Sequence, residues 1–180
     1  LSRMRKLDSA LGSPSKNLKT ILVAGSNGKS LTINFISQIF KEEGITTGSF
    51  YSPHFLTYNE RICLNKTETI QNKQFTETAN EVINVAEKEG INASSRELLT
   101  AVALKHFANS KVDVATLEIE GNNSWDPVNI CSPKVLALTR ITDNEEIDNN
   151  TKIKELISEV SKIAKKDTWV ISADQSKISL

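Results

Sequence analysis

Residues 21–32 read ILVAGSNGKSLT, and this stretch decides the fold because its character changes twice. Four apolar residues lead into a glycine-bearing loop at residues 25–30, and apolar residues at helical spacing then continue to Phe40. A strand, a glycine loop and a helix in this order are typical of a phosphate-binding site. Gly25 and Gly28 let the backbone approach a ligand closely, and amide groups at the start of the helix can then receive phosphate oxygens.

The next two residues of the loop, Lys29 and Ser30, indicate its chemistry. A lysine here supplies a mobile positive charge to the terminal phosphates, and a serine hydroxyl is placed to ligate Mg²⁺. Between the two glycines stand only Ser26 and Asn27, so the loop is a shortened variant of the general Walker pattern. A tight turn between a buried strand and a surface helix is the alternative. It explains the glycines but gives no reason for the order Gly-Lys-Ser.

Composition limits the class of protein. A chain of 180 residues is long enough for one domain with a sizeable core, so residues 1–180 are expected to form a single domain. The 22 basic and 22 acidic residues cancel, and small molecules rather than nucleic acid or a membrane surface are the expected partners. Cys63 and Cys131 show no metal-type or redox-type spacing, which predicts reduced thiols in a cytoplasmic protein. The start at Leu1, without methionine, suggests a fragment.

Helices and strands are predicted to alternate along the chain. Apolar residues at helical spacing predict helices over residues 1–11, 29–44, 74–89, 97–107 and 152–164. Apolar and β-rich runs predict strands over residues 21–24, 45–51, 112–117, 135–139 and 168–172. Residues 55–65, FLTYNERICLN, mix exposed charge with aromatic residues and are assigned to neither a helix nor a strand. The alternation indicates an α/β fold, with a mostly parallel sheet that carries helices on both faces.

Two further side chains, His54 and Glu118, are candidates for function. His54 follows the strand at residues 45–51, where polar residues at the carboxyl end of a strand lie near ligands; a loop histidine without a role fits equally well. Glu118 ends the strand at residues 112–117, as a second magnesium-binding element would, and a solvated acid is the alternative. His106 lies among apolar neighbours and is interpreted as a packed or surface residue.

Three segments together resemble the folylpolyglutamate synthase and dihydrofolate synthase family of the wider Mur-ligase group. They are LGSPSKNLKTILVAGSNGKS at residues 11–30, YSPHFLTYNERICLN at 51–65 and KVDVATLEIEGNNSWDPVN at 111–129. The resemblance covers the chain nearly from end to end. It implies the amino-terminal part of the family's central ATPase domain, with a fold like that of P-loop NTPases, and no counterpart of the carboxyl-terminal ligase domain.

The resemblance also implies a reaction. ATP phosphorylates a carboxylate to an acyl phosphate, and an amine, which is glutamate in the folate enzymes, displaces the phosphate. ATP and Mg²⁺ are the implied cofactors, a folate-like carboxylate and glutamate are the implied substrates, and a monomer is expected. Charge neutralisation on the transferred phosphoryl group would carry most of the catalysis, with Lys29 and Glu118 as catalytic residues.

Matching positions assign the remaining roles. The ATP phosphates would be held by Gly25, Ser26, Asn27, Gly28, Lys29 and Ser30. The first Mg²⁺ would be ligated by Ser30, Ser52 and Glu118. Contacts to the substrate would come from Ser52, His54, Arg61 and Glu97.

The chain departs from the family pattern on the substrate side. Ser95-Arg96 stands where the family has an aromatic pair before Glu97. The family also has a glycine-rich stretch containing an arginine that contacts the pterin, and residues 120–124 stand in its place here. In residues 142–148, Asn144 or Glu145 takes the place of a histidine that ligates a second metal ion; Glu145 can ligate Mg²⁺. The position of a carbamylated lysine falls near Val160, with Lys162 close by.

Two functions of other classes stay open. One is a nucleotide-binding remnant or regulatory domain without ligase activity. The other is a small-molecule kinase, which fits the loop but leaves the second and third segments unexplained.

Overall fold

A computed structural model describes residues 1–121, 123–141 and 150–175 of the chain. Its strands form one seven-stranded sheet in the order β4-β3-β2-β5-β1-β6-β7. Their bounds are β1 Thr20–Ala24, β2 Thr47–Phe50, β3 Ile62–Leu64, β4 Glu68–Thr69, β5 Val114–Glu118, β6 Val135–Leu138 and β7 Trp169–Ser172. The five strands expected from the sequence are all present.

Strand β1 lies in the middle of the sheet and pairs in parallel with β5 on one side and β6 on the other. The β2–β5 and β6–β7 pairs are also parallel. Because parallel strands place their carboxyl ends at the same edge, the residues that follow β1, β2 and β5 are brought together. The predicted class, a mostly parallel α/β sheet, is confirmed.

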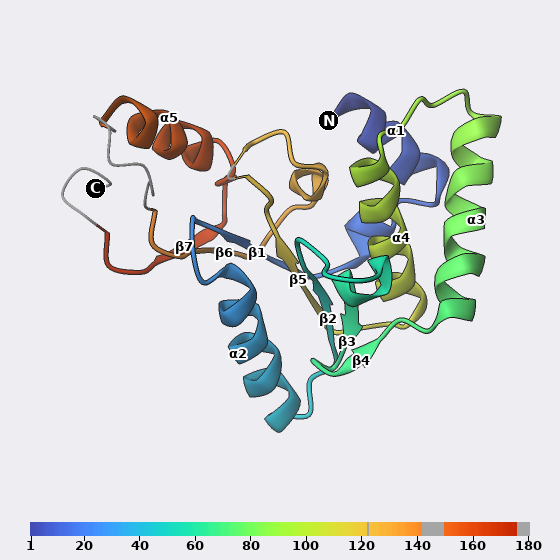
Figure 1. The fold of residues 1–180 in the computed structure, drawn as a ribbon, viewed down its shortest axis with the longest axis horizontal. Helices are drawn as coiled ribbons and strands as arrows, with labels where there is room; N and C mark the ends of the chain where they lie inside the picture. The colour runs from blue at the N-terminus through green and yellow to red at the C-terminus, as the bar shows by residue number, and fades with distance from the viewer. Residues whose placement is uncertain (122, 142–149, 176–180) are drawn as a thin grey trace.

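Helices cover both faces of the sheet, as expected (Figure 1). Helix α2 lies against β1, β2 and β5 on one face, and the other helices lie on the opposite face. The bounds are α1 Ser2–Ala10, α2 Lys29–Glu42, α3 Asn72–Lys88, α4 Ser95–Asn109 and α5 Asn150–Ser161. Helix α4 is the most buried of them because it packs between α3 and the sheet, with Leu104 and Phe107 fully inaccessible.

Residues 55–65, for which the sequence indicated no helix or strand, contribute β3, which forms a hairpin with β4. Both strands pair antiparallel, β3 with β2 and β4 with β3. The connection uses Asn65 at φ 48° and Lys66 at φ 73°, in the left-handed region where L residues are uncommon. Strands of three and two residues are too short to show an alternating pattern, and the turn lacks the glycine that announces most hairpins.

A close contact fixes the height of α4 above the sheet. A Cβ atom at Gly48 of β2 would lie 2.6 Å from the ring of Phe107, so only glycine allows this approach. The helix begins with a capping box, in which Ser94 Oγ accepts from the Glu97 amide and the Glu97 carboxylate accepts from the Ser94 amide. The capping box therefore fixes the residue at which α4 begins.

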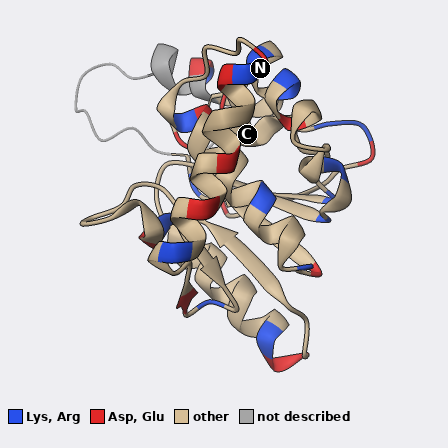
Figure 2. Cartoon of the chain, turned by 90° about the vertical axis from the view of Figure 1, so that its right-hand side faces the viewer, with Lys and Arg blue, Asp and Glu red and all other residues tan. Residues whose placement is uncertain are grey.

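In the view of Figure 2, basic and acidic residues are interspersed along the chain. Among the residues that the structure describes, no helix combines the length and apolar character needed to cross a membrane.

Candidate active site

The phosphate-binding loop follows β1 directly, and α2 begins at Lys29. Gly25 has φ 128° and Gly28 has φ 84°, conformations that L residues rarely adopt. A Cβ at Gly25 would lie 2.0 Å from Thr139 Oγ1, so the loop also needs glycine for its close approach to the residue that follows β6. The amides of the first turn of α2 face the carboxyl edge of the sheet, where the helix dipole favours an anion.

The side chain of Lys29 folds back over the loop. Its Nζ donates to the Gly25 carbonyl at 3.0 Å and to the Ser26 carbonyl at 3.4 Å. The same nitrogen lies 3.9 Å from Oε1 of Glu118. The positive charge therefore lies between the loop and the end of β5, as a lysine that binds phosphate requires.

Glu118 is the point where loop, helix and strand ends meet. Its Oε2 accepts from Ser30 Oγ at 2.9 Å and from the backbone amide of Ser52 at 3.3 Å. Ser30 comes from α2, Ser52 from the segment after β2, and Glu118 from the end of β5. Two hydroxyls and a carboxylate are oxygen donors of the kind that Mg²⁺ prefers, so the residues present fit that ion.

Burial raises the pKa of Glu118 above its ordinary value of 4.5. Hydrogen bonds from Ser30 and the Ser52 amide, and the charges of Lys29 and Arg96, favour the carboxylate but do not fully offset the loss of water. The ionised side chain is thus held at a cost to the folded state, which a bound cation would relieve.

Two arginines converge on the hydroxyl of Ser52. Arg61 Nη1 donates to Ser52 Oγ at 2.9 Å, and Arg96 Nη1 donates to the same atom at 3.3 Å. Arg61 belongs to the short 3-10 helix before β3, whereas Arg96 lies in the first turn of α4. Their guanidinium groups share a second partner, since both form ion pairs with Glu120, at 3.8 and 3.3 Å.

Arg96 was missed by the sequence analysis as a site residue. Its Nη2 also donates to the main-chain oxygen of Glu118 at 3.2 Å and to Asp126 Oδ2 at 3.1 Å, and its guanidinium lies 4.8 Å from the ring centre of Phe50. No local motif surrounds it. The one available signal was its place beside the capping box, which puts the first turn of α4 at the sheet edge.

Of the other predicted substrate residues, His54 lies in the site and Glu97 has its contacts elsewhere. His54 joins the site through Nδ1, which accepts from Arg61 Nε at 2.9 Å, and its ring lies 4.5 Å from that of Tyr58. Glu97 instead caps α4 and forms an ion pair with Arg3 at 3.3 Å. Burial acts to raise the pKa of Glu97, but its hydrogen bonds with Ser94 and Arg3 lower it overall.

The second metal site cannot be placed, because Glu145 and Asn144 lie outside the described residues. Lys162 is described, and its Nζ contacts Glu159 Oε1 at 2.5 Å. Within the described ranges, no three His, Cys, Asp or Glu side chains gather as a metal-binding group.

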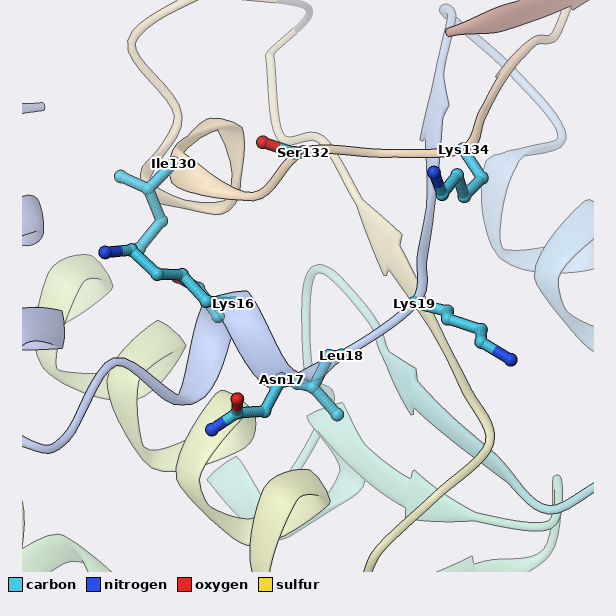
Figure 3. A pocket seen from close by; sticks show the side chains of 8 residues that line it. Lys16, Asn17, Leu18, Lys19, Ile130, Ser132 and Lys134 are labelled. Atoms are coloured by element: carbon cyan, nitrogen blue, oxygen red, sulfur yellow. The ribbon is translucent and has the colours of Figure 1, made fainter. Parts of the chain in front are cut away.

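A cavity of about 420 Å³ adjoins the phosphate-binding loop and is lined by Asn27, Gly28, Leu31, Phe35 and Ile171, among others. A second cavity, of about 360 Å³, lies at the opposite, amino-terminal end of β1 and β6. Lys16, Lys19 and Lys134 line it, but Lys16 and Lys19 point away from each other, so their charges do not converge on one ligand (Figure 3).

Comparison with known proteins supports the resemblance over nearly the whole chain. No protein-family model matches the sequence. The dihydrofolate synthase/folylpolyglutamate synthase of Bacillus subtilis is 34% identical over 179 residues, which cover 96% of this chain and 41% of the relative. The chain thus spans about two-fifths of the length of this relative.

The chain is also similar to solved structures of folylpolyglutamate synthases. Folylpolyglutamate synthase from Thermotoga maritima superposes with a TM-score of 0.89 at 29% identity, over 99% of this chain and 41% of that one. A complex of folylpolyglutamate synthase with AMPPCP and folate superposes with a TM-score of 0.89 at 25% identity, over 98% of this chain and 44% of that one. The expected P-loop-type α/β fold is confirmed by these structures.

Proposed function

We propose, from the premise that this chain belongs to the folylpolyglutamate and dihydrofolate synthase family, that it forms the ATP- and magnesium-binding part of an ATP-dependent ligase. Residues 1–180 would then be one domain of the Mur-ligase central type. The observation that carries the proposal is the hydrogen bond from Ser30 Oγ to Glu118 Oε2, at 2.9 Å. It places the hydroxyl of a phosphate-binding loop against a buried carboxylate, in the arrangement that a Mg²⁺–nucleotide complex needs.

The residues around the loop divide the work. The amides of the loop and the Nζ of Lys29 would bind the ATP phosphates, with Lys29 exchanging its bonds to the Gly25 and Ser26 carbonyls for phosphate oxygens. Ser30, Ser52 and Glu118 would hold Mg²⁺, which when bound supplies charge neutralisation on the transferred phosphoryl group.

The carboxylate to be activated would lie on the other side of Ser52. Arg61 and His54 already form one hydrogen-bonded unit with the Ser52 hydroxyl. Glu97 is also proposed as a substrate contact, because it lies in the first turn of α4. A folate-like carboxylate and glutamate are the proposed substrates, on the support of the relatives' names and of the folate complex. Acyl phosphate formation and attack by the amine of glutamate would complete the reaction.

Three further points belong to the proposal. The chain would act as a monomer on small molecules. Its balanced charge supports small molecules over nucleic acid or a membrane as partners. A cytoplasmic location is supported by the free thiols of Cys63 and Cys131. Glu145 is the proposed ligand of a second metal ion, because its carboxylate offers the oxygen donors that Mg²⁺ prefers.

The experiment is a thermal unfolding series with AMPPCP and Mg²⁺. A ligand that binds only the folded state at a hundredfold excess over its Kd adds about 2.7 kcal/mol, which corresponds to roughly 5–10 °C in Tm for a chain of this size. Lys29→Ala is expected to abolish the shift, because it removes the phosphate-binding charge. Lys73→Ala, at an exposed lysine of α3, is the matched control and should leave the shift unchanged.

Two outcomes separate the alternatives. No shift in the unmutated chain would refute the nucleotide site and with it the proposal. A normal shift without phosphate release, when ATP is supplied with folate and glutamate to a chain extended to the relatives' length, would favour a nucleotide-binding protein without ligase activity.

A further inference from the structure

We propose that Arg96 is a positioning residue that competes with Mg²⁺ for the hydroxyl of Ser52, and so sets the Mg²⁺ concentration at which the nucleotide binds. The inference rests on the proposed function, because it concerns the same metal site. It assigns a role to a side chain that stands where the resembled family has an aromatic residue.

The argument begins with the capacity of one oxygen atom. A serine hydroxyl has two lone pairs and one proton to donate. Ser52 Oγ accepts from Arg61 Nη1 at 2.9 Å and from Arg96 Nη1 at 3.3 Å, so both of its lone pairs are engaged. Ligation of a cation through this oxygen requires a lone pair. One of the two arginines therefore has to release Ser52 when Mg²⁺ binds there.

The hydrogen bond from Arg96 is the one that is easier to break. It is 0.4 Å longer than the bond from Arg61, as the two distances show, and the longer bond is the weaker. Arg96 also keeps its other partners when it lets go. These are the Glu118 carbonyl, the Asp126 carboxylate, the Glu120 carboxylate and the ring of Phe50.

Arg61 has fewer groups to fall back on. Beyond Ser52 it has the Nδ1 of His54 at 2.9 Å and Glu120 at the longer distance of 3.8 Å. Its side chain is also deeply buried, so a released guanidinium would have little water to turn to. Arg61 is thus the permanent support of Ser52, and Arg96 is the exchangeable one.

The test measures the Mg²⁺ requirement of nucleotide binding rather than activity. Tm is followed across a Mg²⁺ titration at fixed, saturating AMPPCP, and each variant is referred to its own Tm without ligand. Arg96→Met keeps the length of the side chain but removes its donors. We expect the Mg²⁺ concentration for half of the shift to fall about threefold to tenfold, the range for one ordinary hydrogen bond, because at 3.3 Å the bond is too long to have the full strength of a charged donor. AMPPCP binding without Mg²⁺ should not change.

Loss of a positive charge near the site would by itself also favour Mg²⁺, and a double-mutant cycle separates the two causes. In a Ser52→Ala background there is no hydroxyl to compete for. Adding Arg96→Met to Ser52→Ala should therefore leave the Mg²⁺ midpoint unchanged. A midpoint that still falls in that background would assign the effect to charge and overturn the inference.

Lys105→Met provides a control on the same helix, because it removes a cation of α4 that pairs with Glu81 at 2.9 Å, away from the loop. It should not move the Mg²⁺ midpoint. An unchanged midpoint in Arg96→Met, with a normal nucleotide shift, would overturn the inference and leave the proposed function standing. Absence of any Mg²⁺-dependent shift in the unmutated chain would overturn both.

Discussion

Ser30 and Glu118 lie 88 residues apart in the sequence, and their side chains are joined by a hydrogen bond of 2.9 Å from Oγ to Oε2. The bond exists because β1 and β5 are parallel neighbours, so the helix that follows β1 starts beside the last residue of β5. It defines where a cation would be shared between the loop and the sheet. Each of the two residues can be tested separately.

Ser30→Ala removes one proposed ligand of Mg²⁺ while leaving the loop backbone intact. We expect the Mg²⁺ concentration for half-maximal stabilisation by AMPPCP to rise about tenfold or more, since even supporting residues of metal sites change affinity by that factor. The measurement is the same Mg²⁺ titration of Tm. Thr32→Ala is the matched control, because Thr32 Oγ1 donates to the Gly28 carbonyl at 2.9 Å instead of to Glu118. An equal effect of both variants would argue against a ligand role for Ser30.

Glu118→Gln is expected to raise the Tm of the ligand-free chain at neutral pH. The pKa of Glu118 is raised by burial above the 4.5 of the unfolded chain. A carboxyl group of this kind stabilises the fold fully below pH 4.5, and that contribution is lost as the pH rises through the pKa of the folded state. The neutral amide avoids the loss, so the gain should be present at pH 7 and shrink toward pH 4.5.

The measurement is Tm against pH for the two proteins without ligand. The same substitution should abolish the Mg²⁺-dependent part of the AMPPCP shift, because an amide cannot replace the charge of the carboxylate. A gain that persists unchanged below pH 4.5 would mean that ionisation of Glu118 is not its cause.

Gly25→Ala and Gly28→Ala should differ, although both glycines have positive φ. At Gly28 a Cβ meets nothing within 4 Å, so alanine pays only the strain of a left-handed backbone, about 1–2 kcal/mol. At Gly25 the Cβ would also lie 2.0 Å from Thr139 Oγ1 and 2.8 Å from its carbonyl oxygen. We expect a loss of about 3 kcal/mol or more there. Urea unfolding of both variants checks the order, and equal losses would contradict it.

The sequence predicted the elements whose pattern is local. The change from Val23 through Gly25 and Gly28 to the helical spacing after Lys29 lies within a dozen residues, and β1 and α2 were found within two residues of their ends. The hairpin of β3 and β4 was not predicted, because its strands are too short to show a period and because β3 is held by pairing with β2.

The site divides in the same way. Motif residues such as Lys29, Ser30 and Glu118 were predicted, and the structure brings them together. Arg96 was not, because its partners Ser52 and Asp126 lie 44 and 30 residues away, and the capping box beside it marks only the start of the helix. Contacts of this kind depend on how α4 is set against the sheet, and a single sequence does not reveal that.

The setting of α4 leads to the last prediction, which concerns Gly48 and Phe107. A Cβ at Gly48 would lie 2.6 Å from the Phe107 ring, so Gly48→Ala must push α4 away from β2. Overpacking of this kind costs about 1–3 kcal/mol. Because Arg96 is carried by α4 and Ser52 follows β2, the same displacement should lengthen their bond and lower the Mg²⁺ midpoint of nucleotide binding.

A smaller partner should reverse both effects. Phe107→Leu in the Gly48→Ala background gives α4 room to return, so urea unfolding should show part of the stability regained, and the Mg²⁺ midpoint should move back toward that of the unmutated chain. Phe107→Leu alone should be destabilising, because it leaves a gap over Gly48. If the double variant recovers stability but not the midpoint, the height of α4 does not control the contact between Arg96 and Ser52.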